Sequence, residues 1–183
     1  MMAQIFYLSG FMASGKSTIG AMLANTLGWK FIDLDEEIEK NEKRKIRQIF
    51  SAKGEDYFRQ LETEVLFDIL LEDKLIISLG GGTLIKSENR NFIKRTGKLI
   101  FLKTSPGIIY KRLKNNKDRP VLLKNGEKQL EKETYLRRIE TLMKKRNSSY
   151  SHADFIFNTD NDSIEKTVEK IAVEIRKSLK QKL

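Results

Sequence analysis

Short apolar runs alternate along the chain with longer segments in which apolar residues recur every three or four positions. Runs of this kind, without alternating polar residues, are typical of strands buried on both faces of a parallel sheet. The runs are Ile5–Leu8, Phe31–Leu34, Leu75–Leu79, Leu99–Leu102 and Phe155–Phe157. The intervening segments have the 3.6-residue period of helices, most clearly over residues 58–69 and 164–179. This alternation predicts an α/β fold with a five-stranded parallel sheet and helices on both of its faces.

Two segments depart from this alternation. Residues 36–61 are highly charged, and residues 114–128 are polar and contain one of only two prolines. We interpret both as excursions from a single domain that spans residues 1–183. Helix starts are predicted at Ser105-Pro106 and at Ser163 or Asp162, which are favoured N-cap residues.

The composition narrows the choice of function only slightly. The chain has 35 Lys and Arg against 25 Asp and Glu, a formal charge of +10. Such an excess suits nucleic acids, membranes or anionic small substrates, and equally a solvated lysine-rich surface. There is no cysteine, which excludes disulfides and thiolate metal sites. No apolar stretch approaches the roughly 18 residues of a membrane span, and no secretory signal is evident. We therefore expect a cytoplasmic protein without a membrane partner, and nothing requires more than a monomer.

A phosphate-binding loop is the strongest motif. Residues 10–17 read GFMASGKS and match G-x-x-x-x-G-K-[ST] at every fixed position, between a strand pattern and a helix pattern. Its glycines let backbone N–H groups surround phosphates at a helix N-terminus, where the helix dipole adds positive charge. Lys16 is expected to reach the β- and γ-phosphates of ATP, and the Ser17 hydroxyl to ligate Mg²⁺. The full set of predicted ATP-binding residues here is Ala13, Ser14, Gly15, Lys16, Ser17 and Thr18.

A small-molecule kinase also needs a site for the hydroxyl that accepts the phosphate. Asp33 and Asp35, in the run FIDLD, are candidates at the end of the second strand. Residues two apart on a strand face the same way, so both carboxylates can point toward the phosphates. The alternative is one aspartate that caps a helix beside another at the surface.

Two further motifs suggest how an acceptor is held. Arg59, in GEDYFRQLE, can clamp a substrate carboxylate with its planar guanidinium, or simply pair with Glu62 three residues later. The run SLGGG places Gly80, Gly81 and Gly82 directly after a strand. Three glycines there allow backbone N–H groups to approach a ligand closely, although a strand-to-helix turn would also use glycine.

Taken in order, these motifs resemble the shikimate kinase family. The set comprises GFMASGKST, FIDLD, GEDYFRQLE, SLGGG, an arginine before proline in DRP, and a later KR…Y, and it runs from the first strand to about Phe157. The resemblance implies a three-layer P-loop NTPase fold of the nucleoside-monophosphate-kinase type. Residues 36–61 would then be its substrate-binding excursion and 114–128 its lid. It also implies ATP-dependent phosphorylation of shikimate to shikimate 3-phosphate, in the chorismate pathway of aromatic amino-acid biosynthesis.

The resemblance assigns residues on the acceptor side. Asp33 would hold Mg²⁺ through water beside Ser17. Asp35 would orient the attacking hydroxyl and take its proton late, because an alcohol has a pKa far above that of a carboxylate. The other acceptor-side assignments are Arg59 and Arg146 (with Arg138 as the alternative to Arg146) on the shikimate carboxylate, Gly80, Gly81 and Gly82 as N–H donors, and Phe50 and Phe58 along the ring.

On the nucleotide side, the resemblance implies that Lys16 and Arg119 share the charge that develops on the transferred phosphate. Arg119 would arrive with the lid, whose closure would exclude water. Arg112 would lie against adenine, with the Asn158–Asp162 loop on the other side of the base. Ala13 stands where the family loop commonly has glycine, and alanine disfavours positive φ.

Two other readings compete with this one. The first is another small-molecule kinase of the same fold, such as a gluconate or nucleoside monophosphate kinase; Arg59 and the triple glycine favour a carboxylated acceptor. The second is a nucleic-acid-binding ATPase, suggested by the charge of +10. That class has basic patches interleaved with aromatic residues or a recognisable RNA-binding module, and the sequence shows neither.

Overall fold

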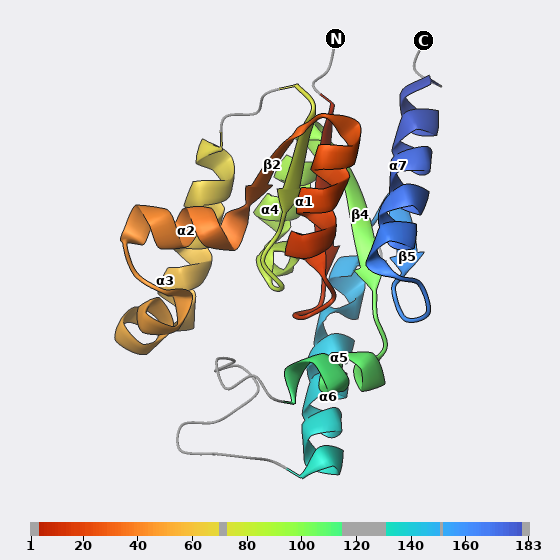
Figure 1. The fold of residues 1–183 in the computed structure, drawn as a ribbon. Helices are drawn as coiled ribbons and strands as arrows, with labels where there is room; N and C mark the ends of the chain where they lie inside the picture. Colours follow the sequence, from red (N-terminus) through yellow and green to blue (C-terminus); the bar gives the residue numbers. More distant parts are fainter. Residues whose placement is uncertain (1–3, 70–72, 115–130, 151, 181–183) are drawn as a thin grey trace.

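The computed structural model describes residues 4–69, 73–114, 131–150 and 152–180, with the backbone alone at 147–150. Within these residues one parallel sheet has the strand order β2-β3-β1-β4-β5 (Figure 1). Its strands are β1 (Ile5–Gly10), β2 (Lys30–Asp33), β3 (Leu75–Ser78), β4 (Lys98–Lys103) and β5 (Phe155–Asn158). The predicted five-stranded parallel sheet is confirmed, and only strand ends differ. Leu34 belongs to a helix because β2 stops at Asp33.

The described helices follow the strands along the chain. They are α1 (Lys16–Leu27), α2 (Leu34–Glu42), α3 (Ile46–Asp68), α4 (Ser87–Thr96), α5 (Pro106–Leu113), α6 (Lys132–Tyr150), α7 (Ile164–Lys180) and a short 3₁₀ helix, η1 (Thr83–Ile85). Two predicted starts are confirmed: Pro106 is the first residue of α5, and the Lys166 N–H donates to Ser163 Oγ at 3.3 Å before α7. No described helix has the length and apolar character to span a membrane.

Helices cover both faces of the sheet, as predicted (Figure 1). Successive residues of β1 show this clearly: Ile5 and Tyr7 pack with α2, α3 and α4, whereas Phe6 and Leu8 pack with α1 and α7. All four side chains are at most 2% exposed. Gly20 brings α1 close to the sheet, since a methyl group there would lie 2.5 Å from the Phe31 ring. Burial on both faces explains why the central strands β1 and β3 read as continuous apolar runs.

The first excursion begins at the carboxyl end of β2. It comprises α2 and the beginning of α3, which bends at Gly54, where φ is 80°. Beyond the bend, α3 packs on the sheet through Phe58, Val65 and Leu66. Apart from Lys114, the predicted lid lies outside the described residues, and Arg119 with it. Helices α5 and α6 flank the lid segment and share a small core of their own around Phe11, at the lower end of the molecule in Figure 1.

Candidate active site

The phosphate loop connects β1 to α1 at the carboxyl edge of the sheet. Gly15, immediately before α1, has a φ of 100°, which only glycine adopts readily. Ala13 also has a positive φ, 59°, so the loop keeps a left-handed turn despite its alanine. Gly10 is required by space, because a methyl group there would lie 2.5 Å from Ser14 Oγ and 2.9 Å from the Leu102 carbonyl oxygen. The predicted strand–loop–helix arrangement is confirmed.

Two side chains of this loop have unusual surroundings. Lys16 Nζ donates to the carbonyl oxygens of Gly10, at 3.1 Å, and Phe11, at 3.3 Å, and thus folds back over its own loop. Ser14 is 1% exposed, and its hydroxyl has no hydrogen-bond partner among the described residues. Buried hydroxyls are normally paired, so this loop holds a polar group suited to a ligand oxygen.

Ser17 and Asp33 join the phosphate loop to β2. Ser17 Oγ donates to Asp33 Oδ2 at 2.6 Å, while Asp33 Oδ1 accepts from the Asp35 N–H at 3.0 Å and caps α2. Asp33 is 7% exposed. A hydroxyl and a carboxylate are hard oxygen ligands of the kind that Mg²⁺ selects. Among the described residues no three His, Cys, Asp or Glu cluster as a metal site, so a cation here would depend on phosphate and water oxygens as well.

The prediction that Asp33 and Asp35 share one strand face is wrong. Asp33 ends β2 and becomes the N-cap of α2, because its side chain satisfies a free N–H of the first helical turn. Asp35 therefore lies on the helix, where it is half-buried. It nevertheless reaches the triple glycine, since a methyl group at Gly80 would lie 2.9 Å from Asp35 Oδ1. The helix-capping alternative applies to Asp33, but Asp35 is not simply a surface residue.

Arg59 takes part in the local ion pair and also lies against the triple glycine. Its Nη1 donates to Glu62 Oε2 at 2.7 Å, and its Nη2 lies 3.3 Å from Glu55 Oε1. A methyl group at Gly82 would lie 2.5 Å from Arg59 Nη2. Burial disfavours the guanidinium charge, but the charges and hydrogen bonds of Glu62 and Glu55 outweigh this and raise the pKa of Arg59. The guanidinium is thus a fixed, permanent cation.

Arg146 approaches the same glycines from α6. It is 7% exposed, and its Nη1 donates to the Gly81 carbonyl oxygen at 2.9 Å. Its guanidinium carbon lies 5.6 Å from the centre of the Phe11 ring, in a cation–π contact. Of the two arginines considered from the sequence, Arg138 and Arg146, it is Arg146 that makes this contact with the loop.

Two aromatic rings lie beside Arg59. The centres of the Phe50 and Phe58 rings are 4.6 Å apart, and the Arg59 guanidinium carbon is 5.1 Å from the Phe58 ring. Phe58 is buried, while Phe50 is half-buried at the edge of the core. Phe50 precedes the bend at Gly54 and Phe58 follows it, and the change in direction of α3 at this bend allows the two rings to meet.

The residues predicted for the nucleotide side lie on α5 and in the loop after β5. Arg112 Nη1 donates to the Ala13 carbonyl oxygen at 2.9 Å, which ties α5 to the phosphate loop. The Ser105 N–H donates to Asp160 Oδ1 at 2.8 Å, and the hydroxyls of Thr104 and Thr159 are 2.6 Å apart. These bonds fasten the loop after β5 to the start of α5. Sequence reasoning missed them because their partners are about 55 residues apart.

Sequence reasoning also missed a second partner of Glu62. Thr83 Oγ1, at the start of η1, lies 2.6 Å from Glu62 Oε1. The only signal in the sequence was a threonine directly after three glycines. Both side chains are 1% exposed, so this pair belongs to the interior just beneath the loop.

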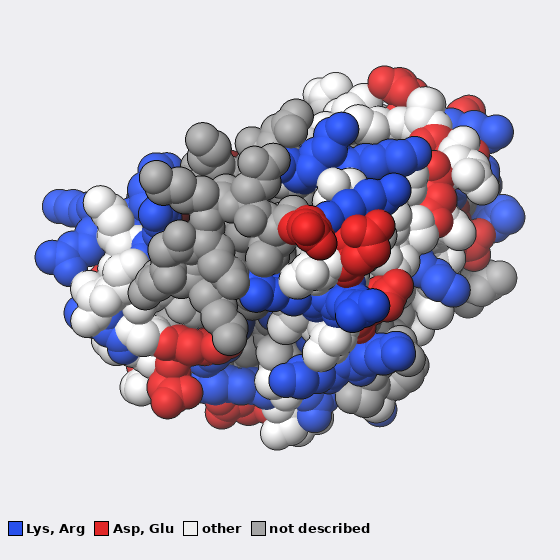
Figure 2. Space-filling view, turned by 90° about the horizontal axis from the view of Figure 1, so that it is seen from below, with Lys and Arg blue, Asp and Glu red and all other residues white. Residues whose placement is uncertain are grey.

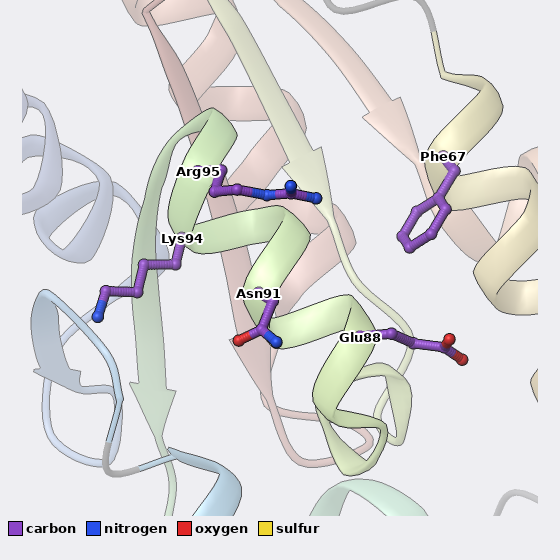
Figure 3. Close-up of a pocket in the computed structure, with 5 residues that line it drawn as sticks. All are labelled: Phe67, Glu88, Asn91, Lys94 and Arg95. Atoms are coloured by element: carbon purple, nitrogen blue, oxygen red, sulfur yellow. The ribbon is translucent and has the colours of Figure 1, made fainter.

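Other surface features lie apart from these residues. A depression of about 450 Å³ is lined by Phe67 of α3 and by residues of α4; Glu88 and Arg95 point toward Phe67, and Lys94 points away (Figure 3). It contains none of the predicted site residues. Seen from below, basic side chains are spread over the surface with acidic ones among them (Figure 2). The positive charge is therefore distributed rather than confined to one patch on this face.

Comparisons with known proteins agree with the geometry. Residues 12–178 match the family model described as shikimate kinase. The shikimate kinase of Chlorobaculum parvum is 43% identical over 178 residues, which cover 97% of this chain and 95% of that protein. That of Chloroherpeton thalassium is 41% identical over 177 residues, with 96% and 94% covered.

Solved structures give the same picture. A shikimate kinase from Acinetobacter baumannii in complex with shikimate is similar with a TM-score of 0.86 and 32% identity, over 96% of this chain and 94% of that one. A gluconokinase from Sinorhizobium meliloti has a TM-score of 0.60 and 15% identity, over 98% and 95%. The second likeness extends to the fold alone.

Proposed function

This chain belongs to the shikimate kinase family and phosphorylates shikimate with ATP, and we propose that the residues around the phosphate loop and the triple glycine carry out the transfer. The observation that carries this proposal is the meeting of two guanidinium groups at one loop, that of Arg146 buried and that of Arg59 partly buried. Arg59 lies against Gly82 and Arg146 bonds to Gly81, from helices far apart in the sequence. Two fixed cations beside the glycine loop suit a carboxylate such as the one that shikimate carries.

The acceptor site is proposed to hold shikimate between α3, α6 and the triple glycine. Arg59 and Arg146 bind its carboxylate, and Phe50 and Phe58 pack along its ring. Backbone N–H groups of the glycine loop, residues 80–82, contact its oxygens. The ring then extends toward Asp35, whose carboxylate lies next to Gly80 on the side of the phosphate loop.

The nucleotide is proposed to occupy the phosphate loop. Lys16 leaves the carbonyl oxygens that it contacts and reaches the β- and γ-phosphates. Backbone N–H groups of residues 13–18 surround the phosphates, and the buried Ser14 hydroxyl donates to one of their oxygens. Arg112 and the loop after β5 enclose the adenine.

Ser17 and Asp33 are proposed to hold Mg²⁺ together with the phosphates, with Asp33 acting through water. The fit rests on the paired hydroxyl and carboxylate oxygens beside the phosphate loop. When bound, the cation neutralises charge on the transferred phosphate. Ser17 could keep its bond to Asp33 at 2.6 Å while a lone pair of its hydroxyl oxygen ligates the cation, because a hydroxyl has one donor proton and two acceptor lone pairs.

The rate of phosphoryl transfer depends mainly on the positioning of the reacting groups and on the stabilisation of charge in the transition state. Asp35 orients the attacking hydroxyl in line with the γ-phosphate and takes its proton late. Lys16 stabilises the developing charge, and Arg119, which lies outside the described residues, is proposed to join it from the lid. Closure of that segment would exclude water and limit ATP hydrolysis.

We also propose that the protein is a monomer, which light scattering tests, and that it is located in the cytoplasm, which cell fractionation tests.

For the reaction, ADP release is measured with MgATP and shikimate, gluconate, AMP or no acceptor. Dependence on shikimate alone is expected. Turnover with gluconate or AMP in its place would overturn the proposed acceptor site.

A further inference from the structure

Thr83 lies in a buried polar cluster immediately behind the triple glycine. It begins η1 directly after Gly82 and is 1% exposed. Its Oγ1 lies 2.6 Å from Glu62 Oε1 and 3.1 Å from the Gly80 carbonyl oxygen. A hydroxyl has one proton to donate, and the shorter distance to a charged acceptor assigns that proton to Glu62.

Glu62 uses its second oxygen for Arg59. Its Oε2 accepts from Arg59 Nη1 at 2.7 Å, and the glutamate side chain is 1% exposed. Both carboxylate oxygens are therefore held, one by Thr83 and the other by the guanidinium. Rotation of this carboxylate would break both bonds at once, in an interior where a lost partner is not replaced by water.

These contacts form a closed ring that includes the triple glycine. Gly82 lies against the Arg59 guanidinium, Arg59 bonds to Glu62, Glu62 bonds to Thr83, and Thr83 follows Gly82 in the chain. The ring is anchored to α4, because Asn89 Nδ2 donates to the Thr83 carbonyl oxygen at 2.9 Å. Asn89 is completely buried, so this anchor is part of the protein interior.

We infer that Thr83 is a positioning residue for the acceptor: its hydroxyl orients Glu62, which in turn holds Arg59 where the shikimate carboxylate binds. The inference rests on the proposed role of Arg59 as a carboxylate clamp. A guanidinium that is already oriented loses less conformational entropy when it binds, which raises affinity without any contact between Thr83 and the substrate. Thr83 therefore acts on shikimate binding and not on ATP.

The test compares Thr83→Val, which keeps the shape and removes the hydroxyl, with Thr83→Ser, which keeps the hydroxyl. Thr83→Val is expected to raise the KM for shikimate about tenfold. The carboxylate is held equally well in the ground state and in the transition state, so weaker binding of this group changes KM and not kcat. Thr83→Ser and the KM for ATP stay near wild type. Thr167→Val is the matched control, since Thr167 is equally buried and donates to Ser163 in α7, away from the site.

A neutral shikimate analogue, with a hydroxymethyl group in place of the carboxylate, separates positioning from a general structural effect. Thr83→Val should leave the KM for this analogue unchanged, since Arg59 has no carboxylate to bind. An unchanged shikimate KM in Thr83→Val, the same KM in Thr83→Val and Thr83→Ser, or an equal rise for the neutral analogue would each overturn the inference.

Two measurements keep the result decisive. Circular dichroism checks that each variant folds. If Thr83→Val does not fold, the KM for shikimate is compared between Thr83→Ala and Thr83→Ser, which again differ in whether the hydroxyl is present. Arg59→Ala is run in parallel. If Arg59→Ala raises the KM for shikimate and Thr83→Val does not, the clamp stands and the role of Thr83 fails. If Arg59→Ala has no effect, the clamp itself fails, and the inference fails with it.

Discussion

Ser17 Oγ lies 2.6 Å from Asp33 Oδ2, so the first turn of α1 is joined to the end of β2 by a single short hydrogen bond. The residues are 16 positions apart, and each belongs to a motif that was identified separately in the sequence. Their meeting brings the phosphate loop and the FIDLD run to one point at the carboxyl edge of the sheet. Ligands of open α/β sheets bind at this edge.

Asp33→Asn should weaken the binding of Mg²⁺ to the enzyme without unfolding it. Asparagine is as good an N-cap as aspartate, so α2 keeps its start, but the ligand charge is lost. The Mg²⁺ concentration for half-maximal activity is expected to rise about tenfold, as is typical when a partner of a metal site is changed. Glu36→Gln, an exposed change of the same charge on α2, is the control. Equal Mg²⁺ titrations in both variants would exclude Asp33 from the site.

Asp35→Asn should lower kcat and leave the KM for ATP nearly unchanged. A positioned acid–base group contributes about 10² to 10⁴ in rate, and the asparagine keeps the size of the side chain. Steady-state rates at saturating ATP and shikimate measure the effect. A kcat within about threefold of wild type would remove Asp35 from the proposed mechanism.

Arg146→Ala and Arg138→Ala separate the two arginines that the sequence left open. Arg146 bonds to Gly81, so its removal is expected to raise the KM for shikimate at least about tenfold, the equivalent of one charged hydrogen bond. Arg138→Ala should change this KM by less than about twofold. The reverse ranking would transfer the clamp to Arg138.

Gly82→Ala should displace Arg59 without destroying the fold. The added methyl group would lie 2.5 Å from Arg59 Nη2, the end of a flexible side chain that can move. We expect a rise in the KM for shikimate of about tenfold or more, together with a lower thermal stability, because a displaced Arg59 loosens its bond to the buried Glu62. Gly107→Ala is the steric control, because a methyl group there meets nothing within 4 Å. Equal shikimate kinetics in both variants would show that Arg59 does not act at this loop.

Ala13→Gly should stabilise the protein. Alanine at a φ of 59° is strained by about 1–2 kcal/mol, and glycine relieves this at an entropic cost of about 0.5–1 kcal/mol. The net gain of up to about 1 kcal/mol corresponds to a rise in Tm of about 2–4 °C for a domain of this size. Differential scanning calorimetry of the two proteins measures it. A lower Tm for Ala13→Gly would show that the alanine side chain stabilises the loop by its packing.

The parts of the fold that depend on local pattern could be predicted from the sequence. All five strands were identified because each reads as an apolar run; β1 and β3 are buried on both faces, whereas the edge strands β2 and β5 are only partly buried. The phosphate loop was identified because its backbone conformation demands particular residues at fixed spacing. The pair Arg59–Glu62 was also visible, since residues three apart meet on one side of a helix.

The parts that depend on tertiary contacts could not be predicted in the same way. The strand interpretation of Asp35 failed because the Asp33 side chain ends β2 by capping α2, a choice that spacing alone does not reveal. The contact of Arg146 with Gly81 joins residues 65 positions apart, so the sequence favoured Arg146 over Arg138 only through its spacing to Tyr150 and could not show the contact itself. For Glu62 the local pair with Arg59 already accounted for the charge, so nothing in the sequence indicated its second partner, Thr83, on another element.

The most direct test of the whole account is the KM for shikimate in Arg59→Ala and Arg59→Lys, compared with wild type and with the KM for ATP in each. Lysine keeps the charge but loses the planar, two-pronged donor, so an intermediate KM is expected for Arg59→Lys. We predict that Arg59→Ala lowers kcat/KM for shikimate about 100-fold or more, while the KM for ATP stays within about twofold. A folded Arg59→Ala protein with wild-type kcat/KM for shikimate would contradict the carboxylate clamp at the triple glycine.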